Sequence, residues 1–505
     1  MYILMPGLNS VPVFFYALND KINFTANFFT IRRYIYMRFK FLCAVLFVAV
    51  LSSCAYSANL GFIPDMRDSQ VMPPNNFISQ TMLAGNKLIT FRSWIDIPYV
   101  TNPSEPEYQV LNVYIPEEYF HGESINGYTA KTAPILMPNG VGGYMPGRQF
   151  VPANDNRHGG PNITLSALAH GYVVVAPAIR GRTLANGKAP ALIVDYKAAV
   201  RWVRHNKEKL PAGDTEKIIS DGLSAGGALS SLLGATGNAK EYEPYLKAIG
   251  AADERDDIFA SAVYCPITDL EHADMPYEWI FNGVNTYHMG PAREMDDNMK
   301  AASEELKKAF PAYLNSLNLK GYTLDENGNG TFRTFIEGLY IEAAQKALDK
   351  GENVLGLEWL SVKDGKITGA DLSKYAVWAT RMKAAPAFDS LNMKSYENNE
   401  FDDKHFTEYS FRHSTADKPA LADSEKIYIM NPLNFIGKEG VNTAKHWRIR
   451  HGVKDRDTSL AVPAILALKL RDAGYDADVA AVWNVPHDGN YDISELFEWI
   501  DSICK

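Results

Sequence analysis

Gly222-Leu223-Ser224-Ala225-Gly226 is the stretch that decides the fold. Before it, residues 217–221 predict a short buried strand, and after it the small residues 227–234 predict a helix that lies close against a sheet. A serine between two glycines at a strand-to-helix turn is typical of a nucleophile elbow, because a Cβ at either glycine collides with neighbouring backbone. Ser224 is therefore the candidate nucleophile.

Candidate partners for Ser224 follow it along the chain. Residues 447–455 predict a strand that ends in a loop at Asp455, and residues 478–483 predict a strand whose following loop carries His487. The order serine, acid, histidine is that of α/β-hydrolases. Loops at the carboxyl ends of parallel strands are also where such sheets place their chemistry. We expect Asp455 to be the acid and His487 the base.

Each candidate has a rival close to it in sequence. Asp457 is the rival for the acid, and His451 is the rival for the base. Because His451 precedes the aspartate in an H-G-x-x-D run, we expect it to shape the loop rather than to act on substrate.

These residue types suit acyl transfer. A serine hydroxyl is a weak nucleophile, so an imidazole with an ordinary pKa of about 6.5 accepts its proton and later returns it to the leaving group. The carboxylate fixes the imidazole tautomer. The developing oxyanion needs preorganised donors, and the N–H groups of Ala225 and of Gly142 or Gly143 are the candidates, since these glycines follow the strand-like residues 133–137.

Strand and helix patterns alternate through the first part of the chain. We expect strands at 88–96, 108–115, 171–176 and 258–265, and an amphipathic helix at 195–206. That alternation predicts a doubly wound, mostly parallel sheet of the α/β class.

The alternation stops between the predicted core segments 54–268 and 432–505. Residues 269–431 have helical patterns rich in charged and aromatic side chains. A stretch of this length is too long for a connection, so we expect a mainly helical inserted lid domain that covers the serine.

Composition excludes several classes of protein. The chain has 505 residues, 46 % of them hydrophobic, with a net charge of -9. It is long and apolar enough to bury a large core, and the acidic balance argues against a nucleic-acid partner. Four cysteines give neither a disulfide framework nor a metal cluster, although a bridge between Cys265 and Cys504 is left open.

The N-terminal region predicts export from a bacterial cytoplasm. Met37-Arg38-Phe39-Lys40 precedes the apolar run 41–51, which is too short for a bilayer span of roughly 20 residues. Residues 1–53 therefore form a predicted signal segment with Met37 as its true start. The end Leu51-Ser52-Ser53-Cys54 predicts lipidation at Cys54, and with it a lipid-anchored periplasmic or cell-surface protein. Cleavage after Ala58 is the alternative and gives a soluble protein.

Taken together, several segments resemble the bacterial tannase family, the serine esterases that cleave gallic acid esters. The segments are 139–147 (NGVGGYMPG), 222–228 (GLSAGGA), 265–274 (CPITDLEHAD), 385–403 (APAFDSLNMKSYENNEFDD), 448–459 (RIRHGVKDRDTS) and 486–492 (PHDGNYD). The resemblance runs through most of residues 60–505. It implies an α/β-hydrolase core with a large inserted lid, a catalytic triad of Ser224, Asp455 and His487, and no cofactor or metal.

The same resemblance implies an aromatic ester substrate. The family's lysine, glutamate and second aspartate that grip the galloyl hydroxyls fall on Lys383, Glu397 and Asp457. A site that hydrogen-bonds the hydroxyls of its substrate leaves its own polar groups unpaired when an analogue lacks those hydroxyls. Its kcat/KM for the substrate then exceeds that for the analogue by about 10⁴. The alternatives are a feruloyl or cinnamoyl esterase of the same fold and a catalytically inactive, anchored polyphenol-binding protein.

Overall fold

The central strands of the sheet are formed by apolar, β-branched runs of the sequence. The computed structural model describes residues 70–505, so the predicted signal segment 1–53, the start at Met37 and the lipidation at Cys54 lie outside the described residues. Strand β5 (Val173–Pro177) shows why such runs become central strands: all of its side chains are buried, as in a parallel sheet covered on both faces.

Nine strands form the main sheet of residues 70–505. Across the sheet they are β1 (Ile78–Ala84), β2 (Lys87–Pro98), β3 (Val110–Pro116), β5, β4 (Pro134–Pro138), β6 (Asp214–Leu223), β7 (Ala260–Tyr264), β12 (His446–Gly452) and β13 (Asp476–Val482). Neighbours pair antiparallel from β1 to β5 and parallel from β5 to β13. The predicted doubly wound, mostly parallel sheet is confirmed.

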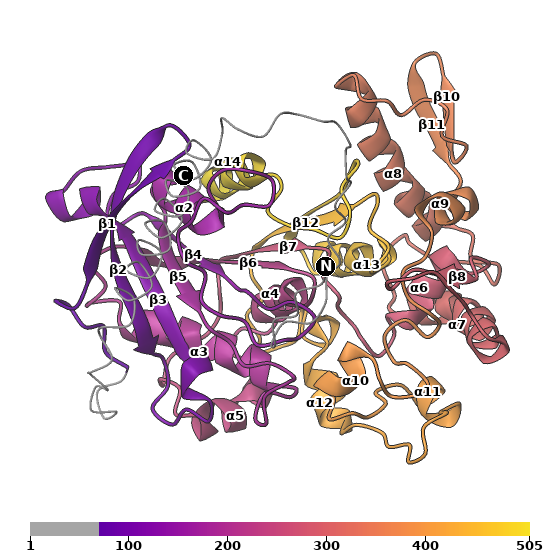
Figure 1. The fold of residues 1–505 in the computed structure, drawn as a ribbon, viewed down its shortest axis with the longest axis horizontal. Helices are drawn as coiled ribbons and strands as arrows, with labels where there is room; N and C mark the ends of the chain where they lie inside the picture. Colours follow the sequence, from indigo (N-terminus) through magenta and orange to yellow (C-terminus); the bar gives the residue numbers. More distant parts are fainter. Residues whose placement is uncertain (1–69) are drawn as a thin grey trace, which may run out of the picture. The chain divides into compact units, whose positions relative to one another are not determined.

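Helices cover both faces of this sheet (Figure 1). Helices α2 (Ile163–His170) and α14 (Ile493–Cys504) pack together on one face, and α3 (Ala191–His205) and α4 (Ala225–Ala235) pack together on the other. Helix α5 (Glu243–Ala248) contacts α3, and α13 (Ala461–Asp472) packs on β12 and β13. Because β4, β6, β7, β12 and β13 are parallel, the loops after them meet at one edge of the sheet.

Between β7 and β12 the chain is mainly helical, as expected. Its helices are α6 (Asp274–Phe281), α7 (Asp297–Ser316), α8 (Thr331–Asp349), α9 (Leu372–Ala379), α10 (Tyr396–Glu400), α11 (Glu408–Arg412) and α12 (Ser424–Ile429). Two small antiparallel pairs interrupt them, β8 (Thr286–Tyr287) with β9 (Arg293–Glu294) and β10 (Leu360–Lys363) with β11 (Lys366–Ala370). The boundaries of a separate lid domain at 269–431 remain a prediction.

The insertion packs against the last strand of the sheet. Helix α8 contacts β13, and the Trp359 ring of the insertion stacks on Trp483 of the core with 6.0 Å between centroids. Figure 1 shows α6 to α9 gathered beside β12 and α13. Within residues 70–505, no helix has the length and apolar character that a membrane crossing requires.

Candidate active site

Ser224 lies at a strained turn between β6 and α4. Its backbone adopts φ 60° and ψ -122°, and its N–H donates to the carbonyl oxygen of Tyr264 at 2.9 Å. A Cβ on Gly222 would collide with the carbonyl oxygen of Gly226, and a Cβ on Gly226 would collide with the side chain of Asn139. This is the steric requirement that the sequence pattern predicts.

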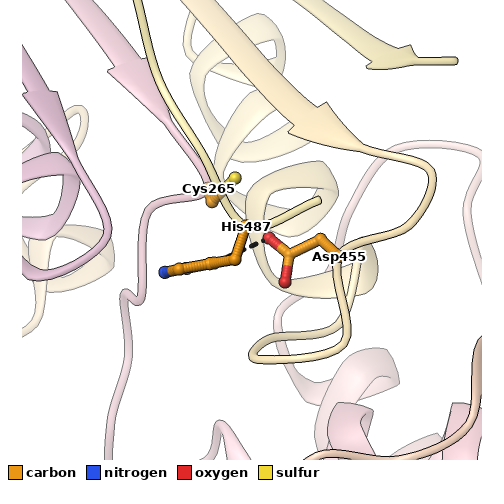
Figure 2. Close-up of side chains that lie close together, drawn as sticks. All are labelled: Cys265, Asp455 and His487. Atoms are coloured by element: carbon orange, nitrogen blue, oxygen red, sulfur yellow. Dashed lines mark hydrogen bonds and ion pairs between the residues drawn. The ribbon is translucent and has the colours of Figure 1, made fainter. Parts of the chain in front are cut away.

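Asp455 and His487 form a hydrogen-bonded pair (Figure 2). Nδ1 of His487 lies 2.8 Å from Oδ2 of Asp455, and the other carboxylate oxygen accepts the N–H of Asp457 at 2.8 Å. Burial lowers the pKa of His487, but the charge and hydrogen bond of Asp455 outweigh it and hold that pKa well above its usual value. Burial also opposes the charge of Asp455, yet the two histidines beside it bring the carboxyl pKa below its usual range.

The two rivals occupy other positions around this pair. His451 is fully buried, with Nε2 at 3.5 Å from Oδ2 of Asp455, and burial lowers its pKa. Asp457 does not contact Nδ1 of His487. Its Oδ1 lies 3.1 Å from Nζ of Lys383 and 3.9 Å from Nε2 of His487. The geometry therefore favours Asp455 as the residue that orients the imidazole.

The loop that carries His487 packs against the elbow that carries Ser224. A Cβ on Gly489 would lie 3.1 Å from Cβ of Leu223, and Nδ2 of Asn490 donates to Oδ2 of Asp221 at 3.1 Å. Within the described residues, Oγ of Ser224 makes no hydrogen bond, so the serine and the imidazole lie in adjacent loops without a direct bond. Catalytic hydrogen bonds are often long in free enzymes and tighten when substrate binds.

Two of the candidate oxyanion donors, Ala225 and Gly142, lie beside the serine. Ala225 is the first residue of α4, so its N–H has no partner within the helix. Across residues 70–505, neither Gly142 nor Gly143 donates its N–H to another group, and Gly142 lines the same cavity as Ser224. The carbonyl oxygen of Gly143, a residue with φ 53°, accepts from Nε of Arg182 at 2.7 Å, which holds the glycine loop in place.

Asn139 fastens the glycine loop to the elbow. Its Nδ2 donates to the carbonyl oxygens of Asp221 at 3.1 Å and Gly226 at 3.0 Å, and to Oγ of Ser230 at 3.1 Å. Sequence reasoning gave Asn139 no role of its own, because these contacts join segments some 80 to 90 residues apart. They fix the distance between the two predicted halves of the oxyanion site.

Lys383, Glu397 and Asp457 come together from three segments of the chain. Lys383 follows α9, Glu397 lies in α10 and Asp457 follows β12. Burial lowers the pKa of Lys383, but the charges of Asp457 and Glu397 outweigh it and raise that pKa. Burial raises the pKa of Glu397, and Lys383 opposes the rise. The ammonium also lies 4.1 Å from the centre of the Phe388 ring. A buried, charged subsite thus adjoins Nε2 of His487.

Side chains that the sequence did not single out hold Lys383 in place. The hydroxyl of Tyr277 accepts the N–H of Lys383 at 3.2 Å and donates to the carbonyl oxygen of Arg456 at 2.8 Å, which links the insertion to the acid loop. Arg381 donates to the carbonyl oxygen of Lys383 at 2.8 Å and forms an ion pair with Glu278 at 2.5 Å. Both members of this pair are fully buried.

Cys265 is a further neighbour of the acid and base. Figure 2 shows its sulfur beside His487, and the ligand atoms of Cys265, Asp455 and His487 all lie within 4.8 Å of one another. Burial and the charge of Asp455 raise the pKa of the thiol to about 11, so the sulfur stays protonated at neutral pH and is a poor metal ligand or nucleophile. Its position directly after β7 was the available sequence signal. Cys265 and Cys504 are both free thiols, so the bridge left open by the sequence is not formed.

Known structures resemble this chain over nearly their whole length. A tannase from Fusobacterium nucleatum is 44 % identical, with a TM-score of 0.82, over 86 % of this chain and 99 % of the tannase. A tannase from Lactobacillus plantarum is 43 % identical, with a TM-score of 0.82, over 86 % of this chain and 100 % of its own. The chain belongs to the bacterial tannase family. It is a carboxylic ester hydrolase, and the predicted α/β-hydrolase fold is confirmed.

Further comparisons also find esterases and tannin acyl hydrolases. The family model BD-FAE matches residues 142–314, which include the elbow. Esterase LipC of Mycobacterium tuberculosis is 36 % identical over 121 residues, which are 23 % of this chain and 26 % of the esterase's length. Two tannin acyl hydrolase structures, each 44 % identical with a TM-score of 0.83, hold 3,4-dihydroxybenzoate and ethyl gallate. They cover 87 % of this chain and 100 % of their own.

Proposed function

We propose that this tannase hydrolyses esters of gallic acid and related hydroxybenzoic acids through an acyl-enzyme. The hydroxyl of Ser224 attacks the ester carbonyl while His487 accepts its proton. The N–H groups of Ala225 and of Gly142 or Gly143 stabilise the oxyanion. His487 then protonates the departing alcohol. In the second half, His487 accepts a proton from water, the water attacks the acyl-enzyme carbonyl, and the acid is released as Ser224 recovers its proton from His487.

The observation that carries this proposal is the contact of Lys383 with Asp457 beside His487. Oδ1 of Asp457 is shared between the ammonium at 3.1 Å and Nε2 of the imidazole at 3.9 Å. An aromatic acid bound to Ser224 reaches this cluster with its ring hydroxyls, and charged donors and acceptors suit three adjacent hydroxyls. The ethyl gallate and 3,4-dihydroxybenzoate complexes of the similar tannin acyl hydrolases support the same class of ligand.

An ester panel tests the proposal. We expect kcat/KM for methyl gallate to exceed that for methyl ferulate, because ferulate has fewer free ring hydroxyls to meet Lys383, Glu397 and Asp457. A preference for ferulate would instead establish the feruloyl esterase alternative. Ser224→Ala should abolish turnover of every ester, and unchanged turnover would remove the serine from the mechanism.

We also propose that the enzyme is exported and anchored by a lipid at Cys54. The basic start at Met37, the apolar run 41–51 and the Leu51-Ser52-Ser53-Cys54 end support this location at the periplasmic or outer surface. Cys54→Ser should move the protein from the membrane fraction to the soluble fraction. Cys43→Ser, a change within the same apolar run, is the matched control and should leave it with the membrane.

A further inference from the structure

The segment between β5 and α3 contacts both the glycine loop, residues 139–147, and helix α10. A Cβ on Gly181 would collide with the backbone nitrogen of Pro146, so the segment lies directly against the glycine loop. At its far end, the N–H of Ala189 donates to the carbonyl oxygen of Glu400 in α10 at 3.0 Å. The segment therefore joins the predicted oxyanion site to the helix that carries one of the predicted acyl-binding side chains.

Within this segment, Arg182 holds the glycine loop at two successive carbonyl oxygens. Its backbone N–H donates to the carbonyl oxygen of Tyr144 at 2.8 Å, and Nε of its guanidinium donates to that of Gly143 at 2.7 Å. The second bond fixes the peptide that follows Gly143, whose own N–H is a candidate oxyanion donor. Because an oxyanion donor is effective when it is held in place before the reaction, the guanidinium acts on this site without contacting substrate.

The other side of the guanidinium faces α10. Nη1 donates to Oδ1 of Asn399 at 3.0 Å, and Cζ lies 4.3 Å from the centre of the Tyr396 ring. These two residues are three apart and so lie on one face of the helix. Burial raises the pKa of Glu397, which follows Tyr396, and both Lys383 and Arg182 oppose that rise. The arginine therefore holds the helix that carries Glu397 and adds to the positive charge around this carboxyl group.

We propose that Arg182 is a positioning residue that keeps the acyl subsite in register with the oxyanion site. The Tyr396 ring contacts the glycine loop directly, since a Cβ on Gly143 would lie 3.4 Å from Cδ2 of the ring. The guanidinium donates to both sides of this contact. An acyl ring held through Glu397 then has its ester carbonyl at a fixed distance from the oxyanion donors. The inference rests on the proposed function, because it uses the galloyl role of Glu397 and the oxyanion role of Gly143.

Other contacts keep this region folded when the Arg182 side chain is removed. The hydrogen bond to Tyr144 comes from the backbone and survives a substitution. Nζ of Lys188 donates to the carbonyl oxygen of Asn399 at 2.6 Å, a group that the end of a helix leaves without a partner in the helix itself. We therefore expect Arg182→Ala to fold with α10 in place but less tightly fixed.

Kinetics on two esters test the inference. Arg182→Ala should lower kcat for p-nitrophenyl acetate by about ten-fold with little change in KM, because oxyanion stabilisation belongs to the transition state. It should lower kcat/KM for methyl gallate by about 100-fold, since a second charged hydrogen bond, the one to α10, is lost as well. Asn399→Ala removes only this second bond of the guanidinium, and should lower kcat/KM for methyl gallate by about ten-fold and leave p-nitrophenyl acetate within about two-fold.

Three further variants separate positioning from general stability. Arg182→Lys should restore p-nitrophenyl acetate hydrolysis but not methyl gallate hydrolysis, because one ammonium replaces the two nitrogens that reach Gly143 and α10. Asp403→Gly removes the other hydrogen bond of the Asn399 side chain, and should change neither ester. Glycine tolerates the left-handed backbone at this position, where φ is 56°.

Arg92→Ala is the control for the loss of an arginine. Nε of Arg92 donates to Oε2 of Glu117 at 2.9 Å, and Cζ lies 3.7 Å from the centre of the Phe120 ring, so the kinds of contact are the same. Arg92 lies on β2, which β3, β5 and β4 separate from β6. The ratio of kcat/KM for the two esters should stay at the wild-type value.

Unchanged kinetics of Arg182→Ala on both esters would overturn the inference. An unchanged ratio of kcat/KM for the two esters in Arg182→Ala would overturn it as well, because the guanidinium then acts on the glycine loop alone. If the enzyme prefers methyl ferulate to methyl gallate, the galloyl proposal fails, and methyl ferulate replaces methyl gallate in the same comparison. A loss on methyl ferulate in Asn399→Ala that p-nitrophenyl acetate does not share would still support the link. The two failures are thus distinguishable.

Discussion

Asp455 and Asp457 lie two residues apart in one loop but face different nitrogens of the His487 imidazole, and this gives the two carboxylates different roles. Asp455 is 1 % exposed and meets Nδ1 of His487, whereas Asp457 meets Lys383 and faces Nε2. A carboxylate at Nδ1 fixes the tautomer with a free Nε2. A carboxylate near Nε2 lies where substrate binds. The assignment of roles thus follows from which ring atom each group faces.

Replacing Asp455 by asparagine should change both the rate and its pH dependence. We expect kcat to fall by about 10⁴, because the amide favours the wrong tautomer. The base works only when unprotonated, so kcat/KM rises with pH through the pKa of His487. Asp455 raises that pKa, and its neutralisation should therefore move the acidic limb to lower pH. A pH profile of kcat/KM measures both effects, and a limb that stays in place would contradict the electrostatic coupling.

Asp457→Asn and Lys383→Ala should lower activity selectively. We expect kcat/KM for methyl gallate to drop by about 100-fold or more, because the ring hydroxyls lose a charged partner inside a buried site. Hydrolysis of p-nitrophenyl acetate, whose acyl group does not reach the cluster, should stay within a few-fold. Parallel assays on the two esters provide the comparison. Equal losses would show that these side chains support the triad and not the acyl group.

At the residue level, the sequence indicates chemistry where that chemistry has a local signature. The elbow makes Ser224 the candidate nucleophile because its glycines and the following helix are contiguous. Asp455 and His487 were chosen by chain order and strand ends, and the structure places them in contact. No local pattern indicates Asn139, Cys265 or the Asp221 and Asn490 pair, since their environments arise only when distant loops meet. Without the family resemblance, Lys383 and Glu397 read as surface charges, yet both are buried.

At the scale of elements, the parallel strands were predictable and parts of the insertion were not. Strands β4, β5 and β7 are buried at every position, and the expected core strands lie within a few residues of the observed ones. The β10–β11 pair was missed within a stretch expected to be helical. Its signal was Asp364-Gly365, both with positive φ (52° and 72°), a turn type that joins hairpin strands. A short hairpin surrounded by helical patterns is easily taken for an interhelical loop.

The buried ion pair between Glu278 of α6 and Arg381, which follows α9, should affect both the free energy of unfolding and the preference for methyl gallate over an acetyl ester. Glu278→Ala leaves Arg381 buried without its carboxylate, which should lower the free energy of unfolding by about 3–5 kcal/mol. Arg381 also holds the carbonyl oxygen of Lys383, so methyl gallate activity should fall more than acetyl ester activity. Urea unfolding and the two assays measure these effects. Glu342→Ala, an exposed acid on α8, is the control and should change stability by less than about 0.5 kcal/mol.

At the scale of the whole described molecule, aromatic packing joins the insertion to the core. Trp359 is 1 % exposed and packs on Tyr375 at 5.2 Å as well as on Trp483 of the core. The hydroxyl of Tyr375 donates to the carbonyl oxygen of Val453, at the start of the acid loop, at 2.9 Å. The segment that supplies Lys383 and Glu397 is thereby fixed to the segment that supplies Asp455 and Asp457. The described residues 70–505 all lie within one compact unit.

Unfolding should therefore be a single event that removes structure and activity together. Trp359→Ala should lower the free energy of unfolding by about 3–5 kcal/mol, through lost burial and a cavity at the junction. Because the junction belongs to both parts, the urea midpoints from tryptophan fluorescence and from ester hydrolysis should shift together and stay coincident. Leu355→Ala, at a side chain that is 57 % exposed, should leave both midpoints unchanged. If activity is lost at a lower urea concentration than fluorescence, the insertion detaches first, and the coupling inferred from Trp359 and Tyr375 is wrong.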